Sequence, residues 1–274
     1  MPAFWRRFRR NRAAVLGAGL LGLVGTVALA GPALYRVDPW ELAGRPFSPP
    51  SGQFPLGTDT LGRDLAAGLV HGARVSLLVG LVATGAALLV GIVLGALAGY
   101  AGGWLDDVLM RFTEFFQTIP SFILAVVLVA IFQPSLTSIV VAIAMVSWPT
   151  VARLVRGEFL ALRHRDFVQA CVALGMPVRA IVFRQILPNA AAPVIVTGSL
   201  MVATAILLES GLSFLGLGDP NVMSWGFMIG SSRTVLRQAW WMSAIPGLAI
   251  LVTVLALNLV GEGLNDALNP RLRR

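Results

Sequence analysis

Residues 165–188 read RDFVQACVALGMPVRAIVFRQILP and form a short polar stretch between two long apolar runs. A lipid-embedded chain that keeps an amphipathic segment between its spans is expected to bind a partner with that segment. Some of its apolar residues recur at i, i+3, i+4 and i+7, the spacing of one face of a helix. The residues with this spacing are Phe167, Ala170, Cys171 and Leu174.

The same stretch contains residues that end one helix and begin another. Gly175 can adopt the left-handed conformation that ends the first helix, and Pro177 suits the first turn of the second. The side chains expected to line the second helix are Val178, Ile181, Val182 and Ile186. Pro188 is expected to close that helix before the next apolar run. The stretch thus predicts helix, tight turn and helix along the membrane surface, and without a partner it would be an interfacial amphipathic pair.

The composition indicates a membrane protein. Hydrophobic residues make up 57% and charged residues only 12% of the 274 residues, whereas a soluble domain averages about 25% charged residues. The apolar runs are long and continuous, which favours spanning helices over the short alternating segments of a β-barrel. We expect an all-α polytopic membrane protein with six spans, the third broken by Gln117 and Pro120. The expected spans are residues 13–34, 75–98, 115–132, 136–155, 190–208 and 240–260.

The distribution of basic charge predicts the orientation. All 21 basic residues are arginines. Fifteen lie in the N-terminus, at Arg111, in or beside the polar stretch and in the C-terminus, against six on the other side. Basic residues favour the cytoplasmic side, so both termini and the polar stretch are expected there. The first apolar run also resembles a signal peptide, but it is longer than the usual apolar region of one.

The residue types present exclude several kinds of chemistry. The absence of lysine excludes a GxxxxGK[ST] phosphate-binding loop, so the chain is not expected to hydrolyse ATP through that motif. His71 and His164 lack metal-site spacing, and the single cysteine, Cys171, allows no intrachain disulfide. Arginines clustered beside spans argue against nucleic acid as a partner.

Charged groups near mid-membrane would indicate an ion-coupled secondary transporter. The centres of the clear spans contain Gly, Ala, Val and Leu instead. Three acidic residues at or just past span ends are expected to snorkel or to be paired structurally: Glu114, Glu209 and Glu262.

Small residues recur at every fourth position in two spans, a pattern that lets helices approach closely. The second span carries Ala83, Ala87, Gly91, Gly95 and Gly99, and the first carries Ala18, Gly22, Thr26 and Ala30. Such stripes can serve packing within the chain or an interface with a second, similar subunit, and the sequence leaves both open.

The polar stretch resembles the EAA loop of ABC importer permeases. The family form is E-A-A-x-x-x-G followed by nine residues and x-x-L-P. The matching residues are Gln169-Ala170-Cys171, Gly175, Gln185, Leu187 and Pro188. Gln169 replaces the usual Glu, so a possible ion pair with an ATPase arginine becomes a neutral hydrogen bond. Further stretches resemble the second-permease type of the dipeptide/oligopeptide/nickel branch: residues 54–64 with 72–77, 209–218 with 224–226, and 246–250 with 258–271.

The resemblance implies a type I ABC importer permease fold in a bacterial cytoplasmic membrane. It implies a tail, first helix and extracytoplasmic segment in residues 1–72, a permease domain in 73–265 with its coupling loop at 156–189, and a tail in 266–274. The implied partners are a homologous permease, two ATPase subunits that bind ATP and Mg²⁺, an extracytoplasmic binding protein and membrane lipid. No cofactor is expected on this chain. The implied cargo is di- or oligopeptides, with nickel or another small ligand as the alternative.

The resemblance also assigns site residues. Those implied to couple to the ATPase are Asp166, Phe167, Gln169, Ala170, Cys171, Leu174, Gly175, Pro177, Gln185, Leu187 and Pro188. Two segments expected outside, 37–74 and 211–239, are candidates for contact with the binding protein, for plugging the pathway or for clasping the second permease. Their candidate contact or gate residues are Asp59, Arg63, Asp64, Asp219 and Trp225. Trp225, Phe227 and Met228 are expected to be exposed.

Overall fold

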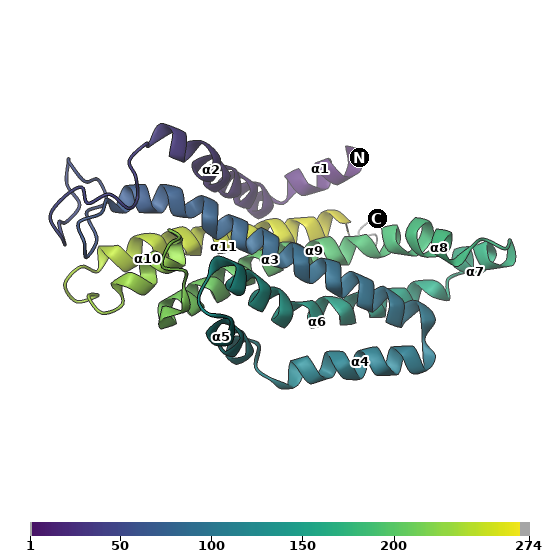
Figure 1. Cartoon of the computed structure of the whole chain (residues 1–274). Coiled ribbons are helices and arrows are strands. Elements are labelled where there is room, and N and C mark those ends of the chain that lie inside the picture. The colour runs from purple at the N-terminus through teal and green to yellow at the C-terminus, as the bar shows by residue number, and fades with distance from the viewer. Residues whose placement is uncertain (1, 269–274) are drawn as a thin grey trace.

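A computed structural model describes residues 2–268, and helices dominate this part of the chain (Figure 1). The α-helices are α1 (Pro2–Arg10), α2 (Arg12–Leu34), α3 (Leu65–Ala101), α4 (Gly103–Thr118), α5 (Ser121–Phe132), α6 (Leu136–Arg163), α7 (Asp166–Ala173), α8 (Val178–Ile181), α9 (Leu187–Leu212), α10 (Trp225–Ser232) and α11 (Trp241–Leu268). The π-helical turns η1 (Val182–Ile186) and η2 (Ser213–Leu217) flank α9. Residues 269–271, which belong to the last stretch with family resemblance, lie outside the described residues.

Within residues 2–268, five helical runs are long and apolar enough to cross a membrane. They are α2, α3, α6, the run Val178–Leu217 around α9, and α11. Helices α4 and α5 form a sixth span if the pair counts as one broken span, since they meet at an angle of 84°. The all-α, multi-pass architecture predicted from composition is confirmed.

The bend between α4 and α5 occurs at the proline that was expected to break the third span. Ile119 is extended, the conformation that residues before proline prefer, and Pro120 caps the start of α5. The predicted boundaries were too narrow, because α4 already begins at Gly103. The expected span 115–132 therefore combines the end of one helix with all of another.

Helices α3 and α6 pack closely through the stripe of small residues on α3. All its members are buried. A Cβ at Gly91, Gly95 or Gly99 would overlap the side chain or backbone of α6. The stripe therefore serves packing within the chain, which answers the question that the sequence left open for this span.

The stripe on the first span behaves differently. Gly22 and Thr26 are exposed, and a Cβ at Gly22 would have no heavy atom within 4 Å. Helix α2 instead turns Gly17 towards α11, where a Cβ would contact Leu259. The exposed stripe on α2 thus makes no close packing within residues 2–268.

The two ends of the bundle are built from different elements. Figure 1 shows the loop between α2 and α3 at one end and α7 and α8 at the opposite end. The loop is held by turns at Gly57 and Gly62, which both have positive φ. Thr58, within this loop, is fully buried and donates a hydrogen bond of 2.6 Å to the Arg45 carbonyl. The structure therefore presents two candidate sites, one at each end.

Candidate functional site

The 165–188 segment folds as predicted into a helix, a tight turn and a second helix. At the end of α7, the Met176 N–H donates to the Cys171 carbonyl and the Gly175 N–H donates to the Val172 carbonyl. This pair of bonds is the Schellman arrangement, which needs a left-handed residue after the helix. Gly175 supplies it with φ +71°. Pro177 precedes α8 as its cap rather than lying in its first turn.

The segment is attached to the bundle through apolar side chains. Val168 from α7, Ile181 from α8 and Ile186 from η1 are each at most 1% exposed. They share a hydrophobic cluster with Val155 and Phe159 of α6. The attachment connects the segment with α6 on one side and, through continuous helix, with α9 on the other.

The predicted apolar faces are only partly buried against this chain. On α7 the buried residue is Val168 rather than Phe167, and Cys171 is only half-buried. On the second helix, Ile181 and Ile186 are buried, but Val178 is 55% exposed. Periodicity found the apolar side of α7, but most of that side does not face this chain.

Several apolar side chains of α7 and its turn consequently face outward. Phe167 and Val172 are exposed, and Leu174 at the turn is 82% exposed. Asp166 lies in the first turn of α7, where a negative charge is favourable. Exposed apolar residues rimmed by polar ones are typical of a protein interaction site.

Polar contacts hold α7 in its position relative to α6. The Gln169 side-chain amide donates to the Arg163 carbonyl at 2.9 Å. The Arg163 guanidinium donates to the Tyr100 carbonyl at 3.1 Å and so caps the end of α3. Arg163 was not assigned a role from sequence, because its partners are more than 60 residues away in the chain.

Pro188 does not end the second helix, contrary to the prediction. Helix continues from α8 through η1 into α9, with Pro188 in the first turn of α9. The wider turn of η1 lets the Leu187 N–H bond to the Val182 carbonyl. The Gln185 carbonyl accepts a 2.6 Å bond from the Asn189 side chain. The helix thus continues past Pro188, which has no backbone N–H to donate and lies in the first turn of α9.

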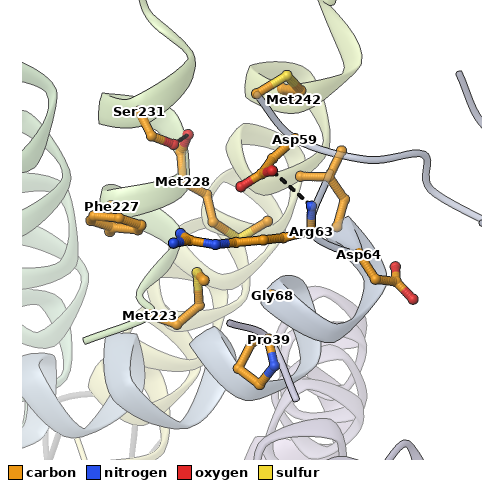
Figure 2. Close-up of a pocket in the computed structure, with 11 residues that line it drawn as sticks. Pro39, Asp59, Arg63, Asp64, Gly68, Met223, Phe227, Met228, Ser231 and Met242 are labelled. Atoms are coloured by element: carbon orange, nitrogen blue, oxygen red, sulfur yellow. Dashed lines mark hydrogen bonds between the residues drawn. The ribbon is translucent and has the colours of Figure 1, made fainter. Parts of the chain in front are cut away.

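At the opposite end of the bundle, Arg63 extends across a small pocket beside Phe227 and Met228 (Figure 2). The Asp59 carboxylate accepts a 2.9 Å bond from the Arg63 backbone N–H, not from its guanidinium. The guanidinium carbon lies 4.6 Å from the centre of the Trp40 ring. Within residues 2–268 the buried Arg63 Nε has no hydrogen-bond partner.

Other residues proposed for this end are part of the chain's own framework. Trp225 was expected on the surface, but it is 3% exposed, and its indole N–H donates to the Leu69 carbonyl at 2.9 Å. Met228 is buried as well. Asp219 accepts a 2.8 Å bond from the Leu136 N–H and so caps α6.

Asp64 has a structural role that the sequence did not reveal. It is buried, and its carboxylate caps α3 by accepting a 2.8 Å bond from the Ala66 N–H. It also accepts a bond from the Tyr35 hydroxyl. This bond, together with burial and the Asp64 charge, raises the pKa of Tyr35 from 10.0 to about 12.

Glu209 joins α9 to α10. It is buried, and its carboxylate accepts hydrogen bonds from Ser224 at 2.7 Å and Ser213 at 3.0 Å. A Cβ at Gly226 would collide with this carboxylate. A paired structural role was expected for Glu209, and the serine hydroxyls provide the partners. Within residues 2–268, no three His, Cys, Asp or Glu side chains are grouped to hold a metal ion.

Comparison with known families and proteins gives matches along the whole chain. Residues 91–274 match the family described as "Binding-protein-dependent transport system inner membrane component". Residues 3–50 match "N-terminal TM domain of oligopeptide transport permease C".

Curated relatives match over nearly their full length. The "Di/tripeptide transport system permease protein DppC" of Pseudomonas aeruginosa (strain UCBPP-PA14) is 42% identical over 100% of this chain and 93% of its own length. The "Dipeptide transport system permease protein DppC" of Bacillus subtilis (strain 168) is 37% identical over 98% of this chain and 85% of its own length.

Solved structures share the fold at low sequence identity. The MetNI methionine ABC transporter in inward-facing conformations matches with a TM-score of 0.60 and 18% identity, covering 74% of this chain and 97% of that chain. An amino acid ABC transporter matches with a TM-score of 0.57 and 15% identity, covering 73% of this chain and 94% of that chain. These likenesses confirm the expected fold.

Proposed function

The chain belongs to the family of binding-protein-dependent transport system inner membrane components, and from this membership we propose that it is one permease subunit of an ATP-driven importer of short peptides. It forms half of the pathway, and a homologous permease forms the other half. Two separate ATPase subunits bind ATP and Mg²⁺ and drive the cycle, and an extracytoplasmic binding protein delivers the cargo.

One observation carries this proposal: the 165–188 segment is anchored on one side and exposed and apolar on the other. Val168 and Ile181 fix it to the bundle, whereas Phe167 and Leu174 point away from it. An exposed apolar surface beside polar residues suits docking into a cleft on another protein. Because the chain contains no lysine, a GxxxxGK[ST] site for ATP must belong to that other protein.

Peptide as cargo rests on the relatives. The names of the curated relatives specify dipeptide or di/tripeptide transport. The proposal also divides the chain into three parts, residues 1–72, 73–265 and 266–274. It places both termini and the 165–188 segment in the cytoplasm. Basic residues at the N-terminus and beside this segment support that orientation.

The way in which the segment is attached supports a mechanism for the proposed importer. Closure of the ATPase pair on ATP draws the 165–188 segment inward. Because α7 is packed on α6 and η1 continues into α9, the displacement passes to both spans as rigid bodies. The pathway then opens towards the loaded binding protein, and hydrolysis resets it. Such domain movement between two packed arrangements is a common form of coupling.

Co-purification tests the proposal. The chain, expressed with its partner permease and ATPases, is expected to retain the ATPases, and vesicles with the binding protein are expected to take up dialanine only with ATP. Leu174→Glu is expected to abolish ATPase retention without unfolding, because Leu174 is exposed. Leu42→Glu, a matched exposed position at the other end, should retain the ATPases. Retention by both variants would refute docking at this segment, and ATP-independent uptake would refute the importer.

A further inference from the structure

A recess of about 300 Å³ lies between α4 and α6 and carries charged side chains of both signs. Its lining residues are Asp107, Met110, Arg111, Glu114, Arg153 and Arg156, and we call it the charged recess. Across residues 2–268, the only ion pair within 4.0 Å joins Arg156 to Asp106. Arg111, Glu114 and Arg153 therefore line the recess without neutralising one another in direct pairs.

The charged recess lies along the length of α4 and α6 rather than at the ends of these helices. Helix α4 runs alongside α6 from the end at which α3 finishes (Figure 1). At 1.5 Å per residue, Arg111 and Glu114 lie about 10–15 Å along α4 from Trp104 near its start. Arg153 lies about 15 Å along α6 from Arg163 at its end, where Arg163 caps α3. The two helices thus bring their charges to the same depth.

Charged side chains on these two membrane helices indicate which face of the bundle contacts water or protein. Arg111, Glu114 and Arg153 are all exposed in the isolated chain. Charged side chains within spans face water or protein rather than hydrocarbon, because lipid cannot solvate them. The face that α4 and α6 form around the recess therefore belongs to an aqueous pathway or to a subunit contact, not to the lipid surface.

The recess is held in shape by contacts that do not use its free charges. Arg156 donates to both oxygens of Asp106, through Nε at 2.5 Å and Nη2 at 2.6 Å. This bidentate ion pair connects the first turn of α4 to α6. Phe112 and Phe116 of α4 also pack on Trp148 of α6. The spacing between the two helices is thus set before any ligand arrives.

Resting on the proposed function, we propose that the charged recess is a weak binding site for the zwitterionic backbone of a short peptide on its way through the pathway. Arg111 and Arg153 pair with the peptide carboxylate, since guanidinium groups suit carboxylates geometrically. Glu114 pairs with the ammonium group. Groups of both signs fit a ligand with two charged ends, and an open recess allows release.

Transport by the reconstituted importer tests this site. In proteoliposomes with both permeases, the ATPases and the binding protein, Arg153→Gln and Glu114→Gln are each expected to lower dialanine uptake at least tenfold. ATP hydrolysis stimulated by the loaded binding protein should stay within twofold of wild type. Arg36→Gln, which neutralises an exposed arginine outside the recess, should transport normally. Uptake within twofold of wild type in both recess variants would overturn the site.

Wild-type controls separate this proposal from the proposed function. If wild-type vesicles show no ATP-dependent uptake of dialanine, the proposed function fails. If they do and the recess variants match them, only the recess fails.

Thiol labelling tests whether dialanine occupies the recess even in complexes that assemble but do not transport. In a Cys171→Ala background, Met110→Cys in the nucleotide-free complex should react with a charged thiol reagent, because Met110 lines the recess but carries none of its charges. Dialanine should slow this reaction at least threefold. Ala125→Cys, at a buried position of α5, should not react. A thiol at position 110 that is unreactive, as in a sealed contact with the second permease, or that dialanine does not protect, would overturn the proposal.

Discussion

Gln169 donates its side-chain hydrogen bond to the carbonyl of Arg163, the last residue of α6, at 2.9 Å. The bond ties the first helix of the 165–188 segment to the span that precedes it. A Glu at this position, the usual residue of the EAA loop, has no proton to donate when ionised. In this chain Gln169 can therefore hold α7 in place as well as meet a partner.

Gln169→Glu is expected to lower the number of peptides transported per ATP, and Gln169→Ala to lower it to a smaller extent. Both variants lose the donor, and the carboxylate also meets the negative end of the α6 dipole, which costs about 0.3–1 kcal/mol. The ratio of uptake to hydrolysis in proteoliposomes measures the effect. A higher ratio for Gln169→Glu would mean that contact with an ATPase arginine outweighs the bond to Arg163.

Gly175→Val is expected to reduce transport at least tenfold. Gly175 has φ +71°, and a Cβ there would meet no heavy atom within 4 Å, so the cost is conformational rather than steric contact with neighbours. A β-branched residue in this region costs about 1–3 kcal/mol. Gly175→Asn is the control, because Asn tolerates the left-handed conformation, and it should keep most of the activity. Equal uptake by the two variants would show that the turn does not matter.

Local rules predicted much of this fold. Apolar length located the spans, the proline rule placed the break at Pro120, and the left-handed preference of glycine placed the turn at Gly175. These features depend on a few neighbouring residues. The charged recess is a different case, because it forms only when Arg111 and Arg153 are brought together from different helices.

Contacts between residues far apart in the sequence explain most of the predictions that were wrong. Trp225 is covered by α3, and its backbone N–H donates to Ser76, 149 residues earlier in the chain. Periodicity in α7 found an apolar side, but it could not show that Val168 faces α6 while Leu174 faces away. The continuous helix through Pro188 needed a π-helical turn, which has no reliable pattern in a single sequence.

Gly95→Ala is expected to lower the thermal stability of the chain in detergent. The added Cβ would overlap the Ala152 carbonyl across the α3–α6 contact. Overpacking of this kind costs about 1–3 kcal/mol. Gly85→Ala is the matched control on the same helix, because nothing lies within 4 Å of its Cβ. Loss of stability in both variants, measured as the unfolding midpoint, would point to the helix itself rather than to the contact.

Tyr35 is expected to ionise near pH 12 instead of pH 10, because its hydroxyl donates to the buried carboxylate of Asp64. The folded state favours the neutral phenol, so this contribution to stability is complete below about pH 10 and is lost as the pH rises to about 12. A Tyr100→Phe background leaves Tyr35 as the single tyrosine, and its phenolate absorbance can then be followed against pH. Adding Asp64→Asn should move the midpoint down towards 10 while keeping α3 capped, since Asn is as good a cap as Asp. An unchanged midpoint would show that Asp64 does not control the phenol, and circular dichroism at each pH would show whether the helices remain folded during the titration.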